Sequence, residues 1–400
     1  MTQKRPTLTD RRYVVPFALI TSLFFLWGFA RAILDVLNKH FQNALDISLT
    51  QSSLIQVTTY LGYFLMAIPA GWFINRQGYR RGVVFGLALF ALGSLMFIPG
   101  SAIGTFYAFL LPLFVIGCGL VFLETAANPY ASELGDKATA SSRLNFSQSF
   151  NGLGCLFATY VVGQFLFDGS SDGGNVVVPY TLLGILVMII AVVFSRVNLP
   201  EIKHEETEED RIKDTRIMKL FKHHPMFVFG LFSLLAYEIA EISINSYFIN
   251  FVTGQGWMDD NSASMVLTIA LGFFMVGRFL GSWIMRRIPA ERMLLYCSLG
   301  SVACLGVVLL DIGQWSMYAL IANYLFEAIM FPTIFSLSLQ GLGNLTKSAS
   351  SLLMMTPIGG CFFLLMGYVA DETNLVVPFL IPFVGYFIVL LYASELSRKS

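Results

Sequence analysis

Long apolar stretches separated by short polar breaks run along almost the whole chain. A helix needs about 20 apolar residues to cross the hydrocarbon core of a membrane, and twelve stretches come close to that length. The breaks between them hold glycine, proline and charged residues, which are typical of turns. The pattern predicts an all-α membrane protein with twelve transmembrane helices, at 14–41, 52–75, 82–100, 104–131, 142–167, 178–197, 225–252, 263–286, 292–311, 315–341, 348–370 and 376–395.

One polar segment, residues 198–224, is much longer than the other breaks. It mixes both charge signs, and we expect a solvated cytoplasmic linker rather than a unit with a function of its own. The linker divides the chain into an N-terminal half, residues 1–197, and a C-terminal half, residues 225–400. Each half holds six predicted spans.

The two halves share short motifs in spans of matching rank. Residues 71–76, after the second span, and 281–286, after the eighth, both begin with glycine and end with arginine. Glu124 in the fourth span and Glu327 in the tenth are each followed by a proline five residues later. Such repeats are typical of transporters that bind substrate near the midplane between their halves. Coincidence between short motifs is the weaker interpretation.

The composition fits a chain that is embedded in lipid. Charged residues make up 12% of the chain and its mean hydropathy is +0.69, whereas a soluble domain carries about 25% charged residues. The net charge of zero creates no field that would attract nucleic acid. The five cysteines form no CxxC pair and the four histidines have no metal-ligand spacing, so we expect no metal site.

Positive charge is distributed unevenly between the two sides of the predicted spans. Of the 25 Lys and Arg residues, 22 fall on the side of the termini and only Lys39 falls on the opposite side. Arg31 and Arg278 lie within spans. Because cytoplasmic loops carry the excess of Lys and Arg, both termini are predicted in the cytoplasm.

Ionisable and amide side chains within the spans are costly in lipid and are therefore candidate functional residues. Neighbours three or four positions apart share a helix face. We expect these faces to line a central cavity that binds a sugar, because carboxylates and amides hydrogen-bond hydroxyl groups. The set is Arg31, Asp35, Glu124, Asn128, Asn145, Gln148, Asn151, Glu238, Glu241, Asn245, Asn323 and Glu327.

Each of these residues, and also Arg278 of the eighth span, has a purely structural role as its alternative. The three amides of the fifth span, Asn145, Gln148 and Asn151, fit a sugar site, but they also fit hydrogen bonds between helices. Arg278 lies near the predicted cytoplasmic end of the eighth span, so we expect a gate or a topological charge there rather than a ligand.

Asp35 and Glu124 are the candidates for proton coupling. A buried carboxylate without a partner favours its neutral form, and a proton-coupled carrier needs a carboxylate that binds a proton outside and releases it inside. Arg31 stands four residues before Asp35. If these two pair, Asp35 is a poor proton carrier, and Glu124 or a glutamate of the seventh span takes the role.

The segment GWFINRQGYRR at 71–81 resembles the signature between the second and third helices of the major facilitator superfamily. Asn75 stands where that signature usually has an acidic residue. Arg76, Arg80 and Arg81 are predicted to form a cytoplasmic latch by bonding helix ends and carboxylates of neighbouring helices. For Arg80 and Arg81, a role in setting topology alone is the alternative.

Further motifs resemble the fucose–galactose–glucose:proton symporter family over nearly the whole chain. The resemblance implies the major facilitator fold with two pseudo-symmetric six-helix halves. It also implies proton coupling through Asp35 and Glu124 and a sugar site that includes Gln148, Asn151 and Glu241. The motifs are LFFLWG at 23–28 with Asp35, LETAANP at 123–129, LNFSQSFN at 144–151, FPTIFSL at 331–337, and the Gly pair at 359–360 with GYVAD at 367–371.

Four positions depart from the pattern of that family. Arg31 replaces a neutral residue, Leu34 replaces the Asn before the aspartate, Glu238 stands in place of Gly, and Glu327 in place of a neutral residue. The extra charges either pair internally, Arg31 with Glu238 or Glu327, or bind a charged substituent of the substrate.

The predicted function is proton-coupled uptake of a monosaccharide of the fucose, galactose and glucose class by alternating access. The alternative is the same fold acting as a uniporter, or as a carrier of an amino sugar, a sugar acid or a cell-wall sugar. An enzyme is not expected, because no His lies away from the end of a span and the spans hold no GxSxG or HExxH motif. We expect a monomer in the bacterial inner membrane, with the lipid bilayer and a sugar as partners, the proton as coupling ion and no cofactor.

Overall fold

The computed structural model describes residues 9, 11–135, 140–167, 177–197, 219–285, 288–342, 345, 349 and 352–399. Every regular element among them is a helix. The α-helices are α1 (Val14–Leu45), α2 (Leu49–Ser52), α3 (Leu54–Gln77), α4 (Tyr79–Leu95), α5 (Phe97–Ile103), α6 (Leu110–Glu133), α7 (Ala140–Phe167), α8 (Val177–Arg196), α10 (Pro225–Gly254), α11 (Asp260–Ile284), α12 (Ala290–Leu309), α13 (Gln314–Glu327), α14 (Met330–Leu339), α16 (Phe363–Glu372) and α17 (Leu380–Lys399). Short 3₁₀ helices are η1 (Arg11–Tyr13), η2 (Phe106–Phe109), η6 (Thr356–Phe362) and η7 (Val377–Phe379).

Ten helical segments in the described part of the chain are long and apolar enough to cross a membrane. They coincide with ten of the twelve predicted spans. The fifth predicted span forms α7, which is outside that set and carries the polar residues Arg143, Gln148 and Asn151 in its first half. The eleventh is divided between η6 and α16. The all-helical membrane architecture is confirmed, whereas the number twelve stays a prediction.

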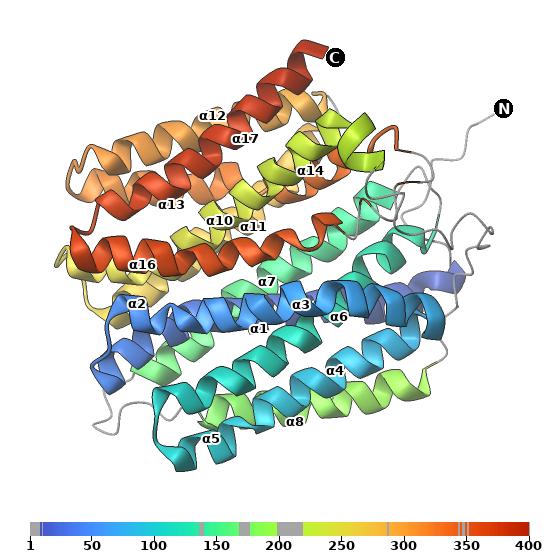
Figure 1. The fold of residues 1–400 in the computed structure, drawn as a ribbon, viewed down its shortest axis with the longest axis horizontal. Helices are drawn as coiled ribbons and strands as arrows, with labels where there is room; N and C mark the ends of the chain where they lie inside the picture. The colour runs from blue at the N-terminus through green and yellow to red at the C-terminus, as the bar shows by residue number, and fades with distance from the viewer. Residues whose placement is uncertain are drawn as a thin grey trace.

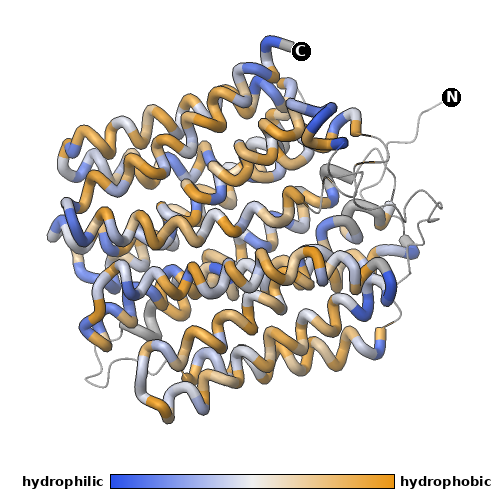
Figure 2. The backbone as a smooth tube through the Cα atoms, viewed as in Figure 1, coloured by the Kyte–Doolittle hydropathy of each residue, from blue (hydrophilic) through white to orange (hydrophobic). Residues whose placement is uncertain are grey.

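Apolar side chains cover the outer surface of the helix bundle and also fill the contacts between its helices. Figure 2 shows hydrophobic residues along the middle of the helices and hydrophilic residues gathered near their ends. On α8, for example, the side chains of Leu182, Ile189 and Val192 are all more than half exposed. A surface with this much exposed hydrocarbon is suited to lipid rather than to water.

The buried hydrophobic residues form two clusters. One is built mainly from α1 to α8 and the other mainly from α10 to α17, and these groups of helices occupy the lower and upper parts of Figure 1. Between the groups, α1 contacts α10, α2 contacts α16, α3 contacts η6 and α7 contacts α11. The candidate site lies where these contacts meet. Most of the predicted linker, residues 198–218, lies outside the described residues.

Two glycines allow α7 to lie directly against α1. A methyl group at Gly28 would overlap the main-chain carbonyl oxygen of Asn151, and one at Gly154 would overlap that of Phe25. The two backbones therefore approach more closely than ordinary side chains permit. This approach brings Asn151 next to the middle of α1.

A polar stripe on α1 faces the C-terminal half. We define the α1 polar stripe as Arg31, Asp35, Lys39 and Asn43, which repeat every four residues and so share one helix face. The Asp35 carboxylate accepts a hydrogen bond from Ser246 Oγ of α10 at 2.7 Å. All four residues bond to α10 or α11, so the stripe joins the halves over about three turns of helix.

The two halves are tied together at the end of the molecule that is opposite the termini. In Figure 1 this is the end with α2 and α16, whereas the start of α1 and the end of α17 lie at the other end. Asp260 of α11 forms an ion pair with Lys39 Nζ at 3.7 Å and accepts a hydrogen bond from Asn43 Nδ2 at 2.5 Å. Asp371 of α16 accepts from the main-chain N of Thr50 at 2.9 Å and from its Oγ1 at 2.5 Å. This end is therefore closed.

Candidate functional site

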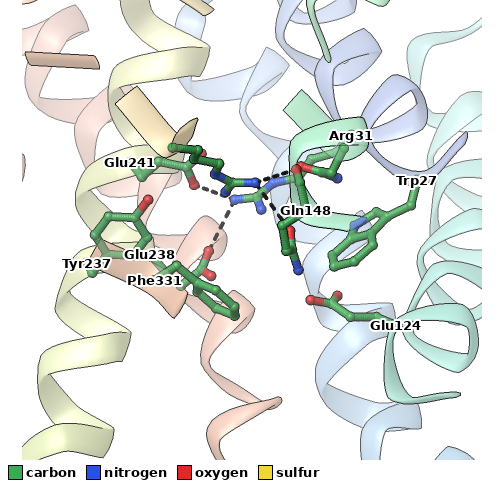
Figure 3. A pocket seen from close by; sticks show the side chains of 10 residues that line it. Trp27, Arg31, Glu124, Gln148, Tyr237, Glu238, Glu241 and Phe331 are labelled. Carbon is green, nitrogen blue, oxygen red and sulfur yellow. Dashed lines mark hydrogen bonds and ion pairs between the residues drawn. The ribbon is translucent and has the colours of Figure 1, made fainter. Parts of the chain in front are cut away.

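A small cavity lies between the two halves beside the middle of α1 (Figure 3). Its volume is about 10 Å³, which is room for about one water molecule. The side chains thus nearly fill the site in this conformation. The lining residues are Trp27, Arg31, Glu124, Gln148 and Asn151 from the N-terminal half, and Tyr237, Glu238, Glu241, Arg278 and Phe331 from the C-terminal half.

Arg31 joins the two halves at the cavity. Its Nη2 lies 3.2 Å from Glu238 Oε2 and also contacts Glu241 Oε2. Asn245 Nδ2 donates to the other oxygen of Glu241 at 3.0 Å and so fixes that carboxylate. Of the pairings that the sequence left open, Arg31 with Glu238 is present. The described contacts of Arg31 include neither Asp35 nor Glu327.

Asp35 lies one helical turn beyond the cavity and does not line it. Its partner Ser246 accepts in turn from Gln56 Nε2 at 2.9 Å. Asp35 is therefore held in a hydrogen-bonded chain between α1, α3 and α10, without a cation within hydrogen-bonding distance in the described residues.

Glu124 stands out among the acids of the cavity. Glu124 is only 4% exposed. Its carboxylate has no hydrogen-bond or ion-pair partner in the part of the chain that the structure describes. Trp27 Nε1 and Asn151 Nδ2 are also buried donors without an acceptor there. In Figure 3, Trp27 and Glu124 lie on one side of the cavity, and Tyr237 and Phe331 on the other. Free donors beside a free carboxylate, with aromatic walls, suit a hydroxyl-bearing ligand.

A network of hydrogen bonds fixes Gln148 and Arg278. Gln148 Nε2 donates to Asn128 Oδ1 at 3.2 Å. Arg278 Nη1 donates to the main-chain and side-chain oxygens of Gln148, and its Nε donates to the carbonyl of Ala328 at 3.1 Å. Arg278 thus reaches the cavity rather than an end of its helix, because a long side chain can place its charge far from its Cα. Asn128 is not among the lining residues, but it accepts the hydrogen bond of Gln148, which is. The side chain of Asn145 lies outside the described residues.

The three arginines of the predicted latch have different partners. Arg80 donates to the carbonyl oxygen of Ser195 near the C-terminal end of α8, where the helix dipole favours a cation. Arg81 bonds to the side chain of Gln77, and Arg76 stacks over an aromatic ring of its own helix. Of these described contacts, only that of Arg80 bonds a helix end.

Glu327 and Asn323 lie away from the cavity, inside the C-terminal half. Both residues are fully buried. Glu327 Oε2 accepts from Asn323 Nδ2 at 2.8 Å and from the hydroxyl of Tyr386, while no described residue donates to its Oε1. Among the described residues no cation lies within bonding distance of this carboxyl group. An ionised carboxylate is costly in such surroundings, so we expect Glu327 to be neutral.

Substitutions of Glu327 test this expectation. Glu327→Gln keeps the shape and the acceptor for Tyr386, so the apparent unfolding temperature of the purified protein should stay close to that of the wild type. Glu327→Ala leaves Asn323 and Tyr386 without their acceptor and opens a cavity, which costs about 2–4 kcal/mol. Thermal unfolding followed by tryptophan fluorescence compares the two. Equal destabilisation by both substitutions would contradict a neutral carboxyl group that glutamine can replace.

Besides Arg278, which was predicted as a gate or topological charge, three aromatic lining residues were not predicted as ligands from the sequence. They are Trp27, Tyr237 and Phe331. Trp27 stands four residues before Arg31, and Tyr237 stands next to Glu238, so proximity to the charged candidates was the available signal. Aromatic residues are so common in these spans that this signal alone could not separate lining from packing.

Comparisons with known proteins agree with this architecture. Residues 20–364 match the Major Facilitator Superfamily. The chain is 32% identical to a glucose/galactose transporter of Brucella abortus biovar 1 (strain 9-941) over 98% of this chain and 97% of that protein. It is also 32% identical to the L-fucose-proton symporter of Escherichia coli (strain K12), over 98% and 95%.

Solved structures agree as well. A crystal structure of the Escherichia coli fucose:proton symporter matches with a TM-score of 0.78 and 30% identity, over 96% of this chain and 99% of that chain. The chain therefore belongs to the Major Facilitator Superfamily and, within it, to the family of the fucose, galactose and glucose symporters.

Proposed function

We propose that this protein is a proton-coupled symporter that takes up a monosaccharide by alternating access. The observation that carries the proposal is a group of three polar side chains in a cavity between the halves. Among the described residues, the Glu124 carboxylate has no partner and the donors of Trp27 and Asn151 have no acceptor. Hydroxyl groups both donate and accept, so they complement these groups. Relatives named as glucose/galactose transporter and L-fucose-proton symporter support the same substrate class.

In this mechanism Glu124 carries the proton. A buried carboxyl group is stable when it is neutral, so the closed cavity favours protonated Glu124 with the sugar bound. When the cavity opens to the cytoplasm, water stabilises the carboxylate and the proton leaves. Asp35, one turn away, is the second candidate for a proton carrier, while Gln148, Asn151 and Glu241 position the sugar.

The same proposal includes the setting of the protein in the cell. We place it in the bacterial inner membrane with both termini in the cytoplasm, because 22 of its 25 Lys and Arg residues fall on that side of the predicted spans. It acts as a monomer in the lipid bilayer, with the proton as coupling ion and without a cofactor. Residues 1–197 and 225–400 rock against each other, joined by the linker at 198–224.

Sugar-induced alkalinisation of the medium tests the proposed function. Energy-starved cells that produce the protein should raise the external pH when glucose, galactose or fucose is added singly, because each sugar enters with a proton. Cells without the protein and cells treated with a protonophore provide the controls. Uptake of labelled sugar without any change in pH would contradict proton symport and indicate a uniporter.

A further inference from the structure

Five of the side chains that line the small cavity are ionisable. Arg31 and Arg278 are cations, and Glu124, Glu238 and Glu241 are acids. With one proton on Glu124, which the proposed function requires, two positive and two negative charges remain and the sum is zero. A closed site within a membrane is most stable when its charges cancel, because isolated charges are poorly compensated at low dielectric constant.

The two cations of the cavity are held in different ways. Arg278 is held by neutral groups, namely the oxygens of Gln148 and the carbonyl of Ala328, and it stacks over the ring of Phe274 at 4.4 Å. Arg31 is held by carboxylates, because its Nη2 contacts both Glu238 and Glu241. The charge of Arg31 is therefore cancelled within the protein.

The contacts of Arg31 leave little room for a ligand. Its side chain is only 23% exposed, and the side chains of Glu238 and Glu241 are 1% and 9% exposed. The arginine comes from α1 and the two acids come from α10, so this ion-paired group joins a cation of one half to acids of the other. A sugar carboxylate that approached Arg31 would have to displace a buried glutamate.

We propose that Arg31, Glu238 and Glu241 determine the charge of the sugar that the site accepts. Glu238 and Glu241 bind the guanidinium of Arg31, which would otherwise be available to the carboxylate of a sugar acid. A sugar acid therefore brings an uncompensated negative charge into the closed cavity. An uncharged sugar leaves the sum at zero. This inference rests on the proposed function, and it goes further by assigning substrate selectivity to three residues.

The charge count selects the substitution that tests the inference. Glu238→Gln keeps the size of the side chain and a hydrogen-bond acceptor for Arg31, but it raises the sum of charges to +1 when Glu124 is protonated. A sugar acid with a single negative charge then restores the sum to zero. Glu327→Gln removes an acid of the same half that lies outside the cavity, so it is the matched control.

The experiment compares inhibition by matched pairs of sugars. Uptake of labelled glucose or galactose into proteoliposomes is inhibited by the unlabelled sugar, or by glucuronate or galacturonate, at a pH at which the sugar acid is ionised. In the wild type and in Glu327→Gln, the sugar acid should inhibit much more weakly than its neutral parent. In Glu238→Gln the ratio of the two inhibition constants should fall by about tenfold, which corresponds to the removal of one unfavourable charge interaction.

Three results would overturn the inference. The sugar acid could inhibit the wild type as strongly as the neutral sugar, the ratio could stay unchanged in Glu238→Gln, or Glu327→Gln could change it as much. If Glu238→Gln does not fold, Glu241→Gln makes the same change of charge at the same guanidinium and decides the question. A failure of the proposed function gives different results. A protein that does not carry monosaccharides takes up neither the neutral sugar nor the sugar acid, and a uniporter takes up the neutral sugar without the change in external pH.

Discussion

Replacement of Glu124 by glutamine should abolish proton-driven accumulation of sugar while sugar binding persists. Glutamine has almost the same shape and keeps an acceptor for a sugar hydroxyl, but it cannot bind and release a proton. Glu124 has no partner in the described structure whose loss would unfold the site. In vesicles with an imposed proton gradient, accumulation of labelled sugar by Glu124→Gln should fall to the level of vesicles without the protein.

Exchange of sugar across the membrane separates a coupling defect from a damaged site. Vesicles loaded with unlabelled sugar should still take up labelled sugar through Glu124→Gln, because exchange needs binding and alternating access but no net movement of protons. Glu327→Gln, an equivalent change outside the cavity, should retain both exchange and accumulation. If Glu124→Gln still accumulates sugar in response to the gradient, another group carries the proton, and Asp35 becomes the first candidate.

Helical spacing in the sequence predicted which polar residues share a face, but not what they contact. Arg31 and Asp35 do share a face of α1, and the same face continues to Lys39 and Asn43. An intrahelical pair of Arg31 with Asp35 was equally compatible with that spacing. The structure instead pairs Arg31 with α10, because the two halves bring oppositely charged groups together across their interface.

The rotation of each helix about its axis explains the other differences between sequence and structure. Asn323 and Glu327 share a face, as their spacing predicts, but this face turns into the C-terminal half and meets Tyr386. Glu241 has comparable chemistry and lines the cavity. Periodicity fixes only the relation between residues of one helix, whereas rotation depends on packing such as the contact of Gly28 with α7. A single sequence contains no direct signal for it.

A covalent bridge between Thr50 and Asp371 should stop transport by holding the two halves together. These residues belong to α2 and α16, and Asp371 Oδ2 lies 2.9 Å from the main-chain N of Thr50. Alternating access requires this end to open, so a bridge across it should lock the closed state. Oxidation of the variant with Thr50→Cys and Asp371→Cys to a disulfide should reduce sugar uptake to the background level. A short bis-methanethiosulfonate reagent, which forms a mixed disulfide with each of the two thiols and releases two sulfinates, should do the same, and a reductant should restore uptake.

A second bridge at the same end provides the matched control, since Gln255 and Asp311 both belong to the C-terminal half and their side chains lie 3.5 Å apart. The variant with Gln255→Cys and Asp311→Cys should accept the same reagent and continue to transport, because a bridge within one half does not oppose its movement. Single-cysteine variants and the treated wild type account for the five native cysteines. If uptake persists when the bridge from Thr50 to Asp371 is complete, this end need not open during transport, and the rocking of the two halves is the wrong description of the cycle.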